Sequence, residues 1–296
     1  MNGRARDEGD LMIDLLRRME ELSTPAATAD REGKRLLPFA AVRQLAEEAD
    51  LPLREVELRA LRAHILPGRY ERSHGTVGWA GQIKLLESTV AVLGCGGLGG
   101  WIVEGLSRMG VGRLIVIDGD SFAENNLNRQ VFCTEGGLGQ LKTEAVRTRV
   151  AVVNSATELI LHSLMANEED MVRLTAGADV VVDALDSIPT RLVLQKVAQT
   201  SGIPMVHGAI AGYVGHVMTI LPGDEGLYAI YGQADLPEKG AEAQVGNPAA
   251  TPMMISAWQI QEVIKILLGA GDLLRNRMLL MDAESGMAQV LEIRNS

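Results

Sequence analysis

The chain has 296 residues, of which 47% are hydrophobic and only 3% aromatic, and its formal net charge is −10 at pH 7. This length suits one large α/β domain with a small appendage, and the acidic balance argues against broad contact with a nucleic-acid backbone, which rewards a basic face. Two cysteines exclude a four-cysteine zinc site, and without a signal-peptide core or an apolar run of about 18 residues we expect a cytoplasmic protein with no membrane partner.

Residues 1–68 are predicted to form a helical extension. An apolar stripe at helical spacing predicts a helix over 8–22, a loop is expected over 23–35, and two short helices are expected over 38–48 and 53–65. The last two resemble a helix-turn-helix. The second of them mixes acidic and basic side chains, which favours a packed appendage over a DNA-reading helix.

The remaining residues, 69–296, are predicted to form a Rossmann-like, doubly wound α/β domain. Buried-strand runs occur at 89–93, 113–117, 178–183 and 204–208, and helical patterns lie at 97–109, 139–153 and 187–201. Such alternation predicts a mostly parallel sheet with helices on both faces.

The C-terminal part changes its pattern. Strands with antiparallel pairing are expected at 215–221, 227–231, 277–282 and 287–293, and a strong helix at 252–269. Residues 232–251 lack an apolar period. A loop of that length inside a compact domain is often a lid or a binding loop.

A glycine motif follows the first strand of this domain. Gly94, Gly96 and Gly99 complete a G-x-G-x-x-G that opens a helix, and Asp118 ends the next strand. A glycine loop at a helix N-terminus cradles phosphates, and an acid at this spacing accepts hydrogen bonds from ribose hydroxyls. The alternative is a tight strand–helix turn without a ligand.

Two cations come soon after that acid. Arg129 follows Asn125, Asn126 and Asn128, and Lys142 opens a predicted helix. Together they could hold the phosphates of a nucleotide, because cleavage between the α- and β-phosphates builds negative charge that fixed cations stabilise. The alternative for each is a solvated surface charge.

Two carboxylates end another predicted strand. Asp183 and Asp186 would lie at the carboxyl edge of the sheet, where ligands bind in such folds. Mg²⁺ is often held by one or two carboxylates plus phosphate, so we expect Asp186 to be its ligand and Asp183 to be structural. As an alternative, Asp186 could cap the helix that starts near Ser187.

Taken together, these motifs resemble the ThiF/MoeB/HesA family, the bacterial relatives of ubiquitin-activating enzymes, from about residue 69 to about residue 293. The matching pieces are Arg69-Tyr70-x-Arg72, Gln82-x-Lys84-Leu85, Leu93-Gly-x-Gly-Gly-Leu-Gly99, Asp118-x-Asp120, Asn126-Leu-Asn-Arg-Gln130, Gly139-x-x-Lys142, Asp183-x-x-Asp186 with Arg191, and Gln261-x-x-x-Lys265.

The resemblance implies ATP- and Mg²⁺-dependent adenylation of a carboxylate, usually the C-terminal glycine of a small β-grasp sulfur carrier or ubiquitin-like protein. It also implies a homodimer in which Arg72 reaches the partner subunit's ATP. The catalytic residues would be Arg72, Arg129, Lys142 and Asp186. The nucleotide-binding residues would be Gly94, Gly96, Gly97, Gly99, Asp118, Asp120, Asn125, Asn126, Asn128, Arg129, Lys142, Asp186 and Ser187.

The chain departs from the family pattern in its cysteines. Many members carry two Cys-x-x-Cys pairs that bind zinc, and some use a cysteine in the crossover loop for covalent transfer. This chain has only Cys95 and Cys133, and its corresponding loop, about 238–252, has none. We therefore expect no zinc, and a covalent enzyme–substrate step is in doubt.

Other functions stay open at this point. The same adenylation chemistry could act on a modified tRNA, a peptide or a small molecule. The glycine loop with Asp118 would also permit an NAD-dependent oxidoreductase. A non-catalytic binder or regulator built around residues 38–65 is a further alternative.

Overall fold

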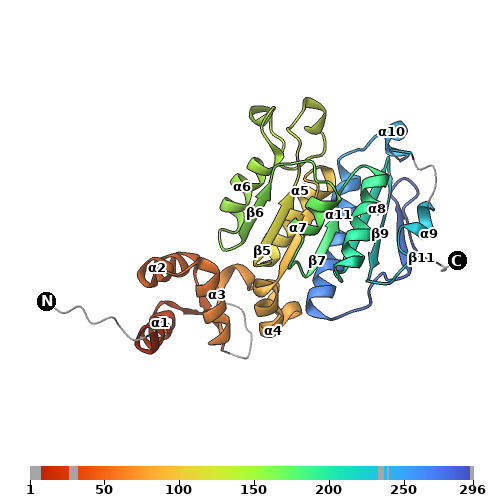
Figure 1. Ribbon diagram of the computed structural model, residues 1–296. Coiled ribbons are helices and arrows are strands. Elements are labelled where there is room, and N and C mark those ends of the chain that lie inside the picture. Colours follow the sequence, from red (N-terminus) through yellow and green to blue (C-terminus); the bar gives the residue numbers. More distant parts are fainter. Residues whose placement is uncertain (1–7, 27–32, 233–236, 239, 294–296) are drawn as a thin grey trace.

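The computed structural model describes residues 8–26, 33–232, 237–238 and 240–293, and its largest element is an eight-stranded sheet with the order β11-β10-β9-β8-β7-β4-β5-β6 (Figure 1). The pairs from β8 through β7, β4 and β5 to β6 are parallel, and those from β8 to β11 are antiparallel. This confirms the predicted fold class: a mostly parallel sheet with antiparallel C-terminal strands.

The strands of this sheet are β4 (Thr89–Leu93), β5 (Arg113–Ile117), β6 (Glu158–His162), β7 (Val180–Asp183), β8 (Met205–Ala211), β9 (Val214–Ile220), β10 (Arg277–Asp282) and β11 (Met287–Glu292). The helices of this part are α4 (His74–Glu87), α5 (Gly97–Met109), α6 (Lys142–Val153), α7 (Glu168–Leu174), α8 (Ile188–Thr200), α9 (Tyr228–Tyr231), α10 (Glu242–Val245) and α11 (Ala250–Leu268).

Helices cover both faces of the sheet. On β4, Val90 and Val92 pack into one apolar cluster with α5, α6 and α11, whereas Ala91 and Leu93 pack into a second cluster with α7 and α8. This alternation follows from the two-residue period of a strand. Burial on both faces also explains why central strands read as continuous apolar runs in the sequence.

One expected strand is wrong. Residues 227–231 form no strand, because the short helix α9 (Tyr228–Tyr231) occupies them. Gly226 has a φ of +58°, which turns the chain just before it, and the backbone N–H of Leu227 donates to Gln195 Oε1 at 2.6 Å. Leu227 is fully buried, so the apolar signal that suggested a strand reflects helix packing instead.

The extension contains α1 (Glu8–Leu22), α2 (Phe39–Ala49) and α3 (Leu53–Arg62), together with a three-stranded sheet of β1 (Thr24–Pro25), β2 (Arg35–Leu37) and β3 (Ile65–Pro67). It lies beside one end of the main sheet (Figure 1). The loop expected over 23–35 was therefore partly wrong, since strands occupy its ends; residues 27–32 lie outside the described residues.

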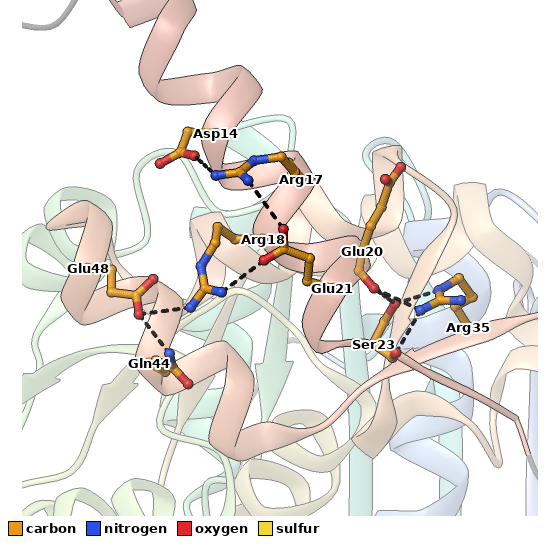
Figure 2. Close-up of polar contacts among 9 residues, drawn as sticks. All are labelled: Asp14, Arg17, Arg18, Glu20, Glu21, Ser23, Arg35, Gln44 and Glu48. Atoms are coloured by element: carbon orange, nitrogen blue, oxygen red, sulfur yellow. Dashed lines mark hydrogen bonds and ion pairs between the residues drawn. The ribbon is translucent and has the colours of Figure 1, made fainter.

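Polar contacts hold the extension together on its surface. Figure 2 shows Arg18 of α1 paired with Glu21 at 3.0 Å and with Glu48 of α2 at 3.3 Å. In the same view Arg35 donates to Ser23 Oγ at 2.6 Å, which ties β2 to the end of α1. Exposed ion pairs of this kind stabilise a fold by about 0–1 kcal/mol each.

The second helix of the helix-turn-helix pattern directs its arginines to partners within this chain. Arg59 pairs with Glu55 at 2.7 Å, and Arg62 pairs with Glu87 at 2.6 Å. These acidic partners offset the charge of the arginines, so the helix offers no uniformly basic face to a phosphate backbone. This favours the packed-appendage interpretation of α3.

A buried polar cluster joins the extension to the main domain, and we call it the junction cluster. It consists of Glu57 on α3, Arg69, Tyr70 and Asn154. Arg69 Nε lies 3.1 Å from Glu57 Oε1, the Tyr70 hydroxyl donates to Glu57 Oε2 at 2.9 Å, and Arg69 also donates to Asn154 Oδ1. Burial raises the pKa of the Glu57 carboxyl, although Arg69 and Tyr70 oppose that shift. The boundary predicted between residues 68 and 69 stays a prediction.

No helix in the described part of the chain is both long and apolar enough to cross a membrane.

Candidate active site

A pocket lies at the carboxyl edge of the parallel strands, where the chain leaves β4, β5, β6 and β7. Eight of the residues predicted for nucleotide binding line it: Gly94, Gly96, Gly97, Asp118, Asp120, Arg129, Lys142 and Asp186. They come from five separate stretches of the sequence. The fold therefore brings the glycine loop, both cations and three carboxylates to one cavity.

The glycine loop is shaped by close backbone approaches. Gly94 has a φ of +96°, and a Cβ there would lie 2.5 Å from the carbonyl oxygen of Ala184. A Cβ on Gly99 would lie 1.8 Å from the carbonyl oxygen of Gly94. Gly99 is thus required for packing and does not line the pocket, whereas Gly96 and Gly97 do.

Asp118 braces this loop from the neighbouring strand. Its Oδ2 accepts a hydrogen bond from Cys95 N at 2.6 Å, and its Oδ1 accepts one from Asp120 N at 2.8 Å. Burial raises the pKa of the Asp118 carboxyl, and the nearby Lys142 ammonium opposes the shift. Because a carboxylate offers about four acceptor positions, these two bonds leave capacity for ribose hydroxyls.

Lys142 is the first residue of α6 and only 6% exposed. Its Nζ lies 2.7 Å from Asp120 Oδ2 and 4.0 Å from Asp118 Oδ2. A buried ammonium needs such compensation. Since the side chain of Asp120 is 57% exposed, a phosphate could replace it as the partner of Lys142.

Arg129 is held by the asparagines that precede it. Its Nη1 donates to Asn125 O and to Asn128 Oδ1, each at 2.9 Å. Asn126 Oδ1 accepts from Ala123 N at 3.0 Å and so shapes the turn. None of the three asparagines is among the residues that line the pocket. They orient the arginine, and their predicted contact with nucleotide stays a prediction.

The turn after β7 separates the roles of its polar residues. Ser187 caps α8, because its Oγ accepts from Thr190 N at 3.4 Å. The alternative that Asp186 is this cap is therefore wrong; Asp186 is exposed and lines the pocket, and Ser187 does not line it. Asp183 is buried, accepting from Leu185 N at 3.0 Å and lying 2.6 Å from His207 Nδ1, as expected of a structural residue.

A family model described as "ThiF family" matches residues 70–296. The chain belongs to the ThiF family.

Similar proteins agree with this membership. The chain is 36% identical to the SAMP-activating enzyme E1 of Haloferax volcanii, over 70% of this chain and 77% of that protein. It is 31% identical to the mouse adenylyltransferase and sulfurtransferase MOCS3, over 97% of this chain but only 62% of that protein. These relatives and the family support an adenylyltransferase activity, and adenylation of a carboxylate, for this chain.

Two solved structures share the fold of this chain. The crystal structure of E. coli MccB with ATP aligns with a TM-score of 0.63 and 21% identity, covering all of this chain and 92% of that one. The crystal structure of PaaA aligns with a TM-score of 0.62 and 18% identity, over 82% of this chain and 73% of that one.

A metal ion bound at this ThiF-family site would have few protein ligands. Among the described residues no group of three or more histidine, cysteine or carboxylate side chains could hold a metal ion. Mg²⁺ needs no such cage, since one carboxylate with phosphate oxygens is a common way to hold it. The exposed, pocket-lining Asp186 fits that role.

Both cysteines are buried, and burial raises the pKa of each thiol. A thiol becomes a nucleophile only as the thiolate. Neither Cys95 nor Cys133 is therefore suited to a covalent step at neutral pH.

Sequence reasoning missed an apolar wall and two amides in the pocket. Leu164, Met165 and Ala166, which follow β6, form the wall together with Met171 and Leu185. The strand β6 has a half-buried pattern and was not expected, so the segment after it gave no signal. The two amides are Gln130, only 6% exposed, and Asn247. Gln130 ends the Asn126-Leu-Asn-Arg-Gln130 motif, but the residue types alone predict no ligand contact for it.

Arg72 lies away from this chain's own pocket. It follows Tyr70, which packs against Gly110 at the C-terminal end of α5, whereas the pocket lies at the N-terminal end of that helix. A helix of 13 residues is about 20 Å long. Arg72 is exposed, and its contact with a partner subunit's ATP stays a prediction.

Proposed function

We propose that this chain adenylates the C-terminal glycine carboxylate of a small β-grasp sulfur carrier protein and releases pyrophosphate. The observation that carries the proposal is the convergence of a glycine loop, a ribose-side acid, two cations and an exposed acid on one pocket. A hydride-transferring enzyme needs the first two of these but not the paired cations. An enzyme that splits a triphosphate needs all of them.

The reaction uses these groups in a fixed order along the nucleotide. Asp118 accepts from the ribose, and the triphosphate lies over Gly96 and Gly97. A carboxylate oxygen of the substrate attacks the α-phosphorus as the bond to pyrophosphate breaks. Arg129 and Lys142 stabilise the charge that builds up on the α-phosphoryl oxygens and the leaving group.

Two features of the cations suit this chemistry. Lys142 would exchange Asp120 for a phosphate oxygen when ATP binds. Arg129 commits only Nη1 to protein oxygens, so within the described part of the chain its Nε and Nη2 have no partner and are available to phosphate. Asp186 would hold Mg²⁺, which neutralises phosphate charge when bound.

The carrier protein as substrate is supported by the names of the relatives, an archaeal SAMP-activating enzyme and a eukaryotic adenylyltransferase and sulfurtransferase. We further propose that ATP with Mg²⁺ is the cosubstrate and that the enzyme acts as a homodimer in the cytoplasm, with Arg72 supplied to the partner's site. A non-protein or peptide carboxylate is the second candidate substrate, favoured by the burial of both thiols, which leaves adenylation as the last step on this chain.

ATP–pyrophosphate exchange tests the reaction, and intact-mass spectrometry identifies the substrate. Purified chain is mixed with ATP, Mg²⁺ and recombinant β-grasp carriers ending in Gly-Gly. We expect exchange that depends on a carrier and a carrier mass increased by one AMP. A carrier lacking its last glycine is the matched control. Exchange with peptides or small carboxylates but with no carrier would favour the second candidate.

A further inference from the structure

The order of strands sets the order of groups along the pocket. From one side to the other, the lining residues follow β6 (Leu164, Met165 and Ala166 of the apolar wall), β5 (Asp118), β4 (the glycine loop) and β7 (Asp186), and end at Ile210 on β8. The wall and Asp118 suit the adenine and the ribose, and the glycine loop suits the phosphates. The β8 side is left for the reactant that carries the carboxylate.

Asn247 reaches the pocket on that side from the segment that leads into α11. Its carbonyl oxygen accepts from Asn128 Nδ2 at 3.1 Å, which ties the segment to the loop that carries Arg129. Next to it, Gly246 O accepts from Gly212 N at 2.8 Å at the β8–β9 turn. The backbone of Asn247 is thus fixed from both flanks.

The side chain of Asn247 is incompletely paired. Its Oδ1 is buried, and no donor reaches it from any described residue. Leaving a buried acceptor unsatisfied costs free energy, so native proteins pair nearly all of them. An unpaired acceptor in the wall of a binding pocket points to a donor on the ligand.

We propose that Asn247 recognises the substrate by accepting a hydrogen bond from the N–H of its last peptide bond. The adenine and ribose donors belong at the opposite side of the pocket, and phosphate oxygens donate nothing at neutral pH. The donor that remains is one close to the reacting carboxylate, and a peptide bond supplies it. The inference rests on the proposed adenylation. It makes Asn247 a residue that selects the C-terminal carboxylate of a peptide or protein over that of a small molecule without a peptide N–H.

The test uses three stable mimics of an acyl adenylate. The first is 5′-O-sulfamoyladenosine, the second its N-acetylglycyl derivative, and the third the acetoxyacetyl derivative, in which oxygen replaces the peptide N–H. Binding of each to the full chain is measured by calorimetry for the wild type, Asn247→Ala and the control Gln244→Ala. Gln244 is exposed in the same segment and does not line the pocket.

We expect the wild type and Gln244→Ala to prefer the acetylglycyl compound to the acetoxyacetyl compound by about 5–10-fold, the worth of one hydrogen bond. Asn247→Ala should bind both equally and should bind plain sulfamoyladenosine as the wild type does. Its melting temperature should match or exceed that of the wild type, because the unpaired oxygen is gone.

Four results would overturn the inference. If Asn247→Ala keeps the preference for the acetylglycyl compound, or if the wild type shows no such preference, the proposed hydrogen bond does not form. A loss of affinity for plain sulfamoyladenosine in Asn247→Ala would make Asn247 a nucleotide contact instead. Failure of the wild type to bind any of the three compounds or ATP would remove the proposed function itself, and the inference with it.

Discussion

The pocket and the junction cluster are both rich in polar groups, but they differ in how these groups are paired. In the junction cluster, Arg69, Tyr70 and Asn154 surround Glu57, and every one of these side chains has a partner in the chain. In the pocket, Gln130 and Asn247 each keep a buried oxygen without a hydrogen bond from the described residues. Glu57 Oε1 also accepts no hydrogen bond from the described residues, but Arg69 forms an ion pair with it, whereas the two amide oxygens of the pocket are available to a ligand.

The two regions also divide one sequence motif between them. Arg69-Tyr70-x-Arg72 is a single piece of the family resemblance. The structure assigns its first arginine to the junction cluster and leaves the second exposed. Substitutions in the two regions should therefore separate stability from catalysis.

The largest expected effect lies in the junction cluster. Arg69→Ala leaves the carboxylate of Glu57, which is fully buried, without its cation. Breaking a buried pair on one side costs about 3–5 kcal/mol, so urea unfolding should show a loss of that size. Arg62→Ala, which breaks an exposed pair with Glu87, is the control and should cost about 0–1 kcal/mol. Equal effects of the two would show that burial at the junction does not matter.

The pocket should show the reverse behaviour. Arg129→Ala should lower ATP–pyrophosphate exchange by about 10²–10³-fold, because a preorganised cation is lost from the transition state. Its unfolding free energy should change little. Arg147→Ala, which removes a surface pair with Glu144, should leave exchange unchanged. Exchange near the wild-type rate in Arg129→Ala would remove this arginine from the mechanism.

Strands that are buried on both faces could be predicted from the sequence, whereas a half-buried strand could not. The bounds of β4 and β5 were predicted correctly because their side chains are buried on both faces and give continuous apolar runs. Edge strand β6 is half-buried and gives no such run, so the part of the apolar wall that follows it in the sequence was not predicted.

Side-chain direction is the second limit. Asn126 and Arg129 lie in one motif, yet the first turns inward to hold the backbone and the second lines the pocket. No pattern of residue types distinguishes them, because the difference arises from contacts within the folded loop.

Asp183, His207 and His216 lie in a row of close polar contacts that should make stability depend on pH. His207 Nε2 lies 3.1 Å from His216 Nε2, while its Nδ1 faces Asp183. Burial lowers the pKa of both histidines, that of His216 to about 3. An unfolded histidine titrates near 6.5, so below that pH the unfolded chain binds more protons than the folded one. The free energy of unfolding therefore decreases as the pH is lowered.

His216→Gln isolates this contribution. Between about pH 6.5 and pH 3, wild-type stability should fall more steeply than that of the variant, by up to about 1.4 kcal/mol for each pH unit. Urea unfolding at pH 7.5, 6.0 and 5.0 measures the difference, and comparison with the variant removes the contributions of the carboxyl groups. Parallel curves would show that His216 is not held neutral by the fold.

The smallest effect concerns Ser187, which the sequence placed among the nucleotide contacts. Its Oγ accepts from Thr190 N and from the Thr190 hydroxyl, the latter at 2.9 Å, and it does not line the pocket. Ser187→Ala should therefore cost about 1 kcal/mol in unfolding free energy through loss of the α8 cap and leave the KM for ATP unchanged. Ser187→Asp, which restores a capping oxygen, should recover most of that stability. A raised KM for ATP in Ser187→Ala without a loss of stability would show that Ser187 contacts the nucleotide and does not stabilise α8 as its cap.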